Sequence, residues 1–141
     1  MKIKSFRDLD VFKNAFEAGM EIFKVSKKFP GDERYSMTSQ IRRCSRSVCA
    51  NIGEAWRKRR FYEKHFVSKL SDSDSEATET QVWLLFAKNC GYLGDDTFQS
   101  LYDKYDKICA QLVRMMENPD QWCENVGKRR VKKEDEETRE D

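Results

Sequence analysis

The sequence has few residues that interrupt a helix and no run that could cross a membrane. Its 141 residues include only two prolines and six glycines, so long stretches can stay helical without a break. No run approaches the roughly 18 consecutive apolar residues that a membrane span needs. The charged N-terminus has no apolar segment of the kind that a secretory signal carries. We therefore expect a cytoplasmic protein without a membrane partner.

Residues that commonly build catalytic and metal sites are also scarce. The single histidine, His65, cannot supply the two Glu-x-x-His pairs of a carboxylate-bridged metal site, and we place it at the surface or at the core boundary. The five cysteines contain no CxxC pair, zinc spacing is absent, and no glycine-rich phosphate loop precedes a helix. Cys44 and Cys109 fall on apolar stripes, so we expect reduced thiols in a core. We predict no enzyme activity, no metal and no cofactor.

What the chain does have is a long amphipathic segment over residues 35–60, which we interpret as one helix. Apolar residues recur there at steps of three and four, the spacing of one helical stripe; they are Met37, Ile41, Cys44, Val48, Ile52 and Ala55. Four arginines lie within roughly 60° of one another on nearly the opposite side; they are Arg42, Arg46, Arg57 and Arg60. One face predicts burial, and the other presents guanidinium groups that a core would reject unless they were paired. The run 57–60 could still be helix or could already be the turn.

The segment before it predicts a helix over residues 8–28, with Asp8 as its cap. Two neighbouring apolar stripes run along this helix, so it should contact more than one partner; they are Leu9, Phe12, Phe16, Gly19 or Met20, and Phe23, and beside them Val11, Ala15, Ala18, Ile22 and Val25. Phe29-Pro30-Gly31 ends the helix, because proline cannot continue the hydrogen-bond ladder.

Two further helices follow the central segment. The third is expected over residues 62–90, and its stripe carries small residues in the middle, so we predict a close helix crossing at Ser73 and Ala77. Gly91 suits a left-handed helix terminus. Asp95 or Asp96 can then cap a fourth helix, which Asn118-Pro119 closes.

Four amphipathic helices with three short connections predict an all-α, antiparallel up-and-down four-helix bundle over residues 1–123. Residues 124–141 differ in character, because five bases in 128–133 are followed by six acids in 134–141. Such charge blocks bury too little apolar surface to become ordered, so we predict a disordered, charged tail.

Charge is distributed unevenly along the bundle. Eight lysine or arginine residues and two acids lie between Arg42 and Lys64, whereas residues 71–80 hold four acids and no base. Those acids, Asp72, Asp74, Glu76 and Glu79, form either a solvated face or ion pairs with the arginines of the central helix. Arg42 and Arg43 in particular could pair with Glu76 or Glu79 across the two helices.

Several stretches together resemble the bacterial four helix bundle family, also described as proteins encoded in intervening sequences of 23S ribosomal RNA genes. The matching segments occur in the family's order over roughly residues 8–117; they are DLDVFKNA from Asp8, KFP from Lys28, YSMTSQIRR from Tyr35, SVCANIGE from Ser47, EATETQ from Glu76, and GYL from Gly91. The family often has Asn-Ile-Ala-Glu-Gly where this chain has Asn51-Ile52-Gly53-Glu54-Ala55, and the tail after about Cys123 has no counterpart.

The resemblance implies an antiparallel four-helix bundle that assembles into a ring-shaped homopentamer. One branch is similar to the accessory protein of diversity-generating retroelements, a basic pentameric barrel that binds nucleic acid and associates with a reverse transcriptase. For this chain the resemblance therefore implies a homo-oligomer, with RNA or DNA and a reverse transcriptase as further partners.

Two functions are compatible with these patterns. In the first, an oligomer binds RNA or DNA phosphates without reading sequence, through Arg42, Arg46, Arg57 and Arg60, with Arg43, Lys58, Arg59 and Lys64 adding to the field. In the second, the bundle is a protein-interaction scaffold that does not bind nucleic acid, with Trp56, Tyr62 and Trp83 as candidate contacts. Pairing of the arginines with the acids of the third helix would weaken the first hypothesis.

Overall fold

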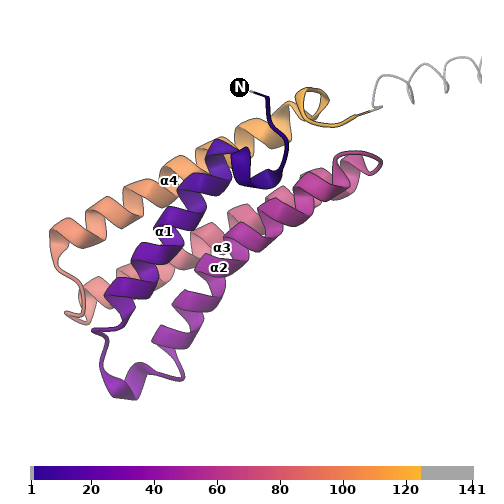
Figure 1. Ribbon diagram of the computed structural model, residues 1–141. Coiled ribbons are helices and arrows are strands. Elements are labelled where there is room, and N and C mark those ends of the chain that lie inside the picture. The colour runs from indigo at the N-terminus through magenta and orange to yellow at the C-terminus, as the bar shows by residue number, and fades with distance from the viewer. Residues whose placement is uncertain (1, 125–141) are drawn as a thin grey trace, which may run out of the picture.

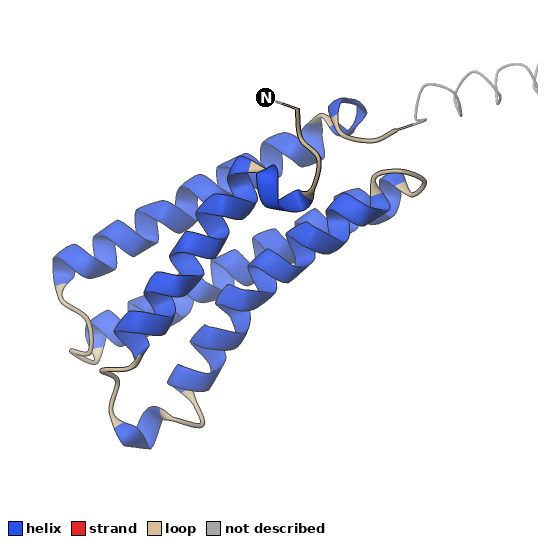
Figure 2. Cartoon of the chain, in the orientation of Figure 1, coloured by secondary structure: helices blue, strands red, loops and turns tan. Residues whose placement is uncertain are grey.

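The computed structural model describes residues 2–124, which are helical apart from turns, and no strand occurs in that range. The four long helices are α1 (Asp10–Ser26), α2 (Met37–Lys58), α3 (Glu63–Asn89) and α4 (Asp95–Glu117). Short 3-10 turns precede α1 and α2 and follow α4; they are η1 (Phe6–Asp8), η2 (Gly31–Glu33) and η3 (Pro119–Gln121) (Figure 2). Except for Glu124, the predicted charged tail lies outside the described residues.

Successive helices run in opposite directions, as Figure 1 shows. α1 contacts α2 and α4, and α3 contacts the same two helices, so the four helices surround one core. The predicted antiparallel up-and-down four-helix bundle is confirmed. Within the described part of the chain, no helix is both long enough and apolar enough to cross a bilayer.

The apolar stripe of α2 is buried, as predicted, from Met37 to Ala55. In α1 the two predicted stripes differ in burial. The stripe of smaller side chains faces the core, where Ala15, Ala18 and Ile22 are fully buried, whereas Phe16 is 54% exposed and Met20 42% exposed. α1 therefore presents a second apolar face to the outside of the bundle.

The central helix is shorter than predicted at both ends, because it spans Met37–Lys58. The carbonyl of Lys58 accepts a hydrogen bond from the Tyr62 amide at 2.9 Å, which turns the chain toward α3. Arg59 and Arg60 consequently lie in the turn, and Arg60 does not continue the stripe of Arg42, Arg46 and Arg57.

The predicted aspartate caps were wrong. Asp8 accepts hydrogen bonds from the Lys4 amide at 2.9 Å and the Ser5 amide at 3.1 Å, so it closes a capping box on η1 and does not cap α1. These two hydrogen bonds also lower the pKa of its carboxyl group. α4 begins after Gly94 without a side-chain cap. Asp95 and Asp96 occupy its first turn, where their negative charges interact favourably with the helix dipole. Gly91 does have the predicted left-handed conformation, with φ of 80°.

The predicted close crossing is confirmed between α2 and α3. Ser73 and Ala77 are fully buried, and the Ser73 hydroxyl donates to the carbonyl of Val48 at 2.8 Å. Because this bond reaches the α2 backbone itself, the small side chains of α3 set how closely the two helices approach.

Candidate nucleic-acid interface

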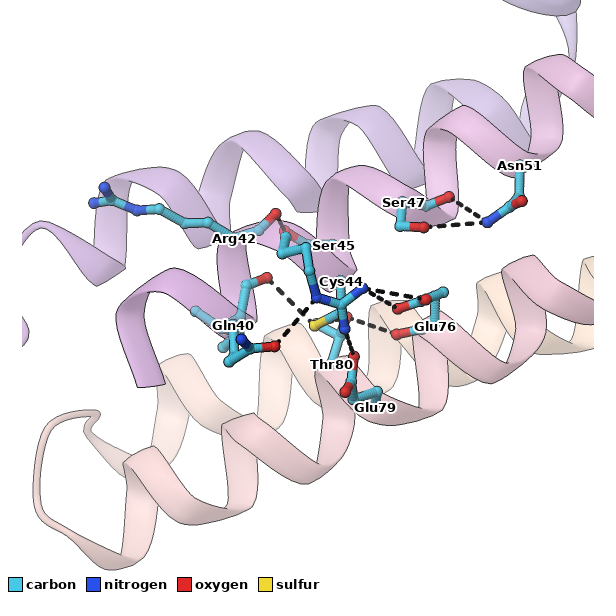
Figure 3. Close-up of polar contacts among 11 residues, drawn as sticks. Gln40, Arg42, Cys44, Ser45, Ser47, Asn51, Glu76, Glu79 and Thr80 are labelled. Carbon is cyan, nitrogen blue, oxygen red and sulfur yellow. Dashed lines mark hydrogen bonds and ion pairs between the residues drawn. The ribbon is translucent and has the colours of Figure 1, made fainter. Parts of the chain in front are cut away.

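The arginines on α2 fall into separate environments, which the helix sequence alone does not distinguish. Arg42 points toward α1, where its Nε donates to the Ser26 hydroxyl at 2.8 Å and its guanidinium lies 5.1 Å from the centre of the Phe23 ring. Figure 3 shows Arg42 extending away from Glu76 and Glu79. The predicted alternative of pairing with the α3 acids is therefore not realised for Arg42.

Arg43 does pair with α3. Its Nη1 lies 3.3 Å from each carboxylate oxygen of Glu76, its Nη2 donates to Glu79, and its Nε donates to Gln40 at 3.1 Å (Figure 3). The hydrogen bond to Glu76 and the neighbouring negative charges raise the pKa of Arg43. The positive charge of Arg43 is thus offset within the bundle.

Arg46 and Arg57 are exposed and form no ion pair or hydrogen bond through their side chains within residues 2–124. Both line a groove of about 670 Å³ between α1 and α2. The walls of this groove are mostly apolar; they include Phe6, Phe12, Phe16, Met20 and Phe23 on one side, and Ser45, Cys49, Ala50 and Gly53 on the other. We call this feature the α1–α2 groove.

The floor of the α1–α2 groove has room for a side chain at Gly53. A methyl group at Gly53 would meet the Phe6 ring at 3.7–3.9 Å, which is ordinary van der Waals contact. Alanine at this position would therefore fit the same backbone without displacing Phe6.

The remaining predicted basic residues surround the turn from α2 to α3. The Arg59 guanidinium lies 3.6 Å from the centre of the Trp56 ring and donates to the Trp56 carbonyl at 3.0 Å. Glu124 receives contacts from Arg59 at 3.5 Å and from Arg60 at 3.3 Å. Arg59 therefore fixes the turn and the end of the bundle, and part of its charge is offset there.

Lys58 and Lys64 lie on either side of this turn. The Lys58 ammonium is 5.5 Å from the centre of the Tyr62 ring, and Lys64 is exposed without an ion pair in the described part of the chain. Sequence reasoning missed one further cation, Lys27. Its ammonium lies 4.5 Å from the centre of the Phe23 ring, which Arg42 also contacts. Only the packing of α1 against α2 reveals that neighbour, because the two residues lie 15 positions apart.

The thiols show no sign of activation. Cys44 is fully buried, as predicted, and Cys109 is partly buried. Burial raises the pKa of Cys44 to about 11 and that of Cys109 to about 12, which keeps both thiols neutral. Residues 2–124 contain no group of three or more His, Cys, Asp or Glu side chains that could hold a metal ion. His65 is exposed, as expected.

These features define a class of small helical protein, an antiparallel four-helix bundle whose second helix carries unpaired arginines beside an apolar groove. The sequence profile of the 23S rRNA-intervening sequence protein family matches residues 7–114, and the chain belongs to that family. No curated protein matches the chain. A crystal structure of a protein of unknown function from the S23 ribosomal protein family of Bacteroides thetaiotaomicron is similar, with 25% sequence identity and a TM-score of 0.68. The alignment covers 76% of this chain and 95% of that one.

Proposed function

We propose that this chain is a non-enzymatic, homo-oligomeric bundle protein that binds RNA or DNA through phosphate contacts from the outer face of α2. The observation that carries the proposal is the separation of charges on that helix. Glu76 and Glu79 offset Arg43, whereas the Arg46 and Arg57 side chains have no ion pair among residues 2–124. Arg42 lies in line with them, and its side-chain partners among residues 2–124 are the neutral groups of Ser26 and Phe23.

The length of this stripe suits a nucleic-acid backbone. From Arg42 to Arg57 the helix rises by about 22 Å at about 1.5 Å per residue. One strand of duplex DNA presents about six phosphates over that length. Such contacts are insensitive to sequence. Binding through them weakens steeply as the salt concentration rises, because less free energy is then gained from counterion release.

Fluorescence-anisotropy titration with labelled RNA and labelled duplex DNA, at rising salt, tests this proposal. We expect micromolar or tighter binding at low salt and at least a tenfold loss for Arg46→Glu/Arg57→Glu. The matched control is Lys107→Glu/Arg114→Glu, which reverses two exposed charges on α4 and should have a much smaller effect. Light scattering checks that both variants keep the oligomeric mass.

Absence of binding at low salt would overturn the nucleic-acid proposal, and so would an equal loss in the α4 control. An Arg46→Glu/Arg57→Glu variant that loses its oligomeric mass would show that these arginines hold copies of the chain together.

The proposed oligomer is supported by apolar surface that one copy leaves exposed. The α1–α2 groove offers Phe16 and Met20, and a separate stripe on α3 offers Val82, Leu85 and Phe86, each more than 40% exposed. Two unlike faces suit head-to-tail contacts, which close into a ring when the rotation between copies allows it. A pentamer, and a reverse transcriptase as a partner, follow from the family resemblance alone.

The same groove supports a second candidate, a protein-interaction scaffold that does not bind nucleic acid. An apolar floor with charges at its rim is the usual composition of a protein interface. An intact oligomer without RNA or DNA binding at low salt would favour this alternative.

A further inference from the structure

The turn between α2 and α3 lies at one end of the bundle (Figure 1), and aromatic rings are exposed there. Tyr62 is 54% exposed and Phe61 is 53% exposed. The rings form an edge-to-face series, with centroids 6.3 Å apart between Phe61 and Tyr62 and 5.6 Å apart between Tyr62 and His65. Among the described residues, neither the Phe61 ring nor the Tyr62 ring belongs to the hydrophobic core or packs against it.

Cations lie in and beside this turn. Lys58 lies 5.5 Å from the centre of the Tyr62 ring. Arg57 and Lys64 are exposed nearby in the sequence and have no ion pair among residues 2–124. Between Arg57 and His65 the only acid is Glu63. The turn therefore combines exposed aromatic rings with several positive charges, in a segment of nine residues.

This combination favours unpaired nucleotides over a duplex, a distinction that the arginines of α2 alone do not make. Cations bind the phosphates of a duplex and of a single strand alike. An exposed aromatic ring adds affinity only where a base is unstacked and can lie on it, as in single strands, loops and ends.

We propose that the α2–α3 turn binds unpaired nucleotides, with a base stacked on Tyr62 and the flanking phosphates held by Arg57, Lys58 and Lys64. The proposal rests on the nucleic-acid binding proposed above and narrows it to single-stranded segments. The α2 stripe then continues the path of the backbone away from the turn.

The test compares two labelled 12-residue oligonucleotides, one of uridines and one with the same backbone but no bases. The 141-residue chain should bind the oligouridine at least about fivefold more tightly than the abasic strand, because stacking contributes about 1–3 kcal/mol per base. Tyr62→Ala should abolish this preference and leave the affinity for the abasic strand unchanged. Tyr62→Phe keeps the ring and should behave as the wild type.

The possible failures are distinguishable. If neither strand binds at low salt, both this inference and the proposed function are overturned. If the wild type binds both strands equally, the base stacking proposed here is overturned, but the proposed phosphate binding stands. This comparison needs no variant. Retention of the base preference by Tyr62→Ala would overturn the role of Tyr62. A loss of oligomeric mass in that variant would also overturn the proposal, because the ring would then lie between copies of the chain.

Discussion

At the scale of single residues, neighbouring arginines on one helix have unlike roles because each faces a different element. Arg43 faces α3 and pairs with two carboxylates, whereas Arg42 faces α1 and lies over the Phe23 ring. Arg46 contacts neither these carboxylates nor that ring through an ion pair or a cation–π interaction. The Arg43 side chain is 48% exposed, so these ion pairs add little to stability. Their consequence is electrostatic, because they remove one positive charge from the surface that could attract phosphate.

Buried thiols give a prediction at the same scale. Burial raises the pKa of Cys44 and of Cys49 to about 11, from an ordinary value of 9.0. The folded chain keeps these protons at a pH where the unfolded chain releases them. The free energy of unfolding should therefore fall as pH rises from about 9 to 11, by up to about 1.4 kcal/mol per pH unit for each thiol.

Urea denaturation at pH 7.5, 9 and 10.5 measures this effect. Cys44→Ala/Cys49→Ala should reduce the decline in stability above pH 9, and Cys90→Ala, at an exposed position, should not. Equal declines in both variants would contradict the assignment to the buried thiols.

At the scale of elements, side-chain size decides which face of a helix enters the core. In α1 the alanines 15 and 18 are buried and let α1 pack closely, while Phe16 is left outside. In α3 Ser73 and Ala77 serve the same purpose against α2. Because protein interiors are packed to high density, an enlarged side chain at such a crossing must displace a helix or adopt a strained rotamer.

We therefore expect Ala77→Leu to destabilise the bundle by about 1–3 kcal/mol through overpacking between α3 and α2. The matched control is Ser75→Leu, because Ser75 lies on the same helix but is exposed. Chemical denaturation monitored by circular dichroism compares the two midpoints. Equal midpoints would show that the crossing can open to admit a larger side chain.

At the scale of the whole molecule, the bundle leaves two unlike apolar faces uncovered, the α1–α2 groove and the Val82–Leu85–Phe86 stripe of α3. Contiguous apolar patches of this kind mark interaction sites in folded proteins. Arg46 and Arg57 lie at the rim of the first face, so assembly and nucleic-acid binding would use neighbouring surface.

Phe16→Glu tests whether the α1–α2 groove is used for assembly. A carboxylate in the apolar groove cannot be desolvated without a large penalty, so we expect the proposed oligomer to dissociate into folded monomers. Light scattering gives the mass, and circular dichroism gives the helical content. Val113→Glu, at a position that is 40% exposed on α4, should keep the wild-type mass. An unchanged mass in Phe16→Glu would exclude the groove as the contact between copies.

The sequence by itself determined the number of helices and most of their limits, because these depend on local features. Period 3.6 identified each helix, Pro30 and Pro119 ended two of them, and Gly91 supplied a left-handed terminus. The caps were less predictable, because Asp8 bonds to the turn before it and Asp95 lies inside the first turn of α4.

Only the tertiary structure decided which basic residues remain available. Arg43 and Glu76 lie 33 positions apart, and their contact depends on the register of α2 against α3. The proximity of Lys27 to Arg42 likewise depends on how α1 lies against α2. A helical wheel gives the direction of each side chain around its own axis. It does not contain the neighbouring helix, and the neighbour's side chains determine whether a charge is offset or left exposed.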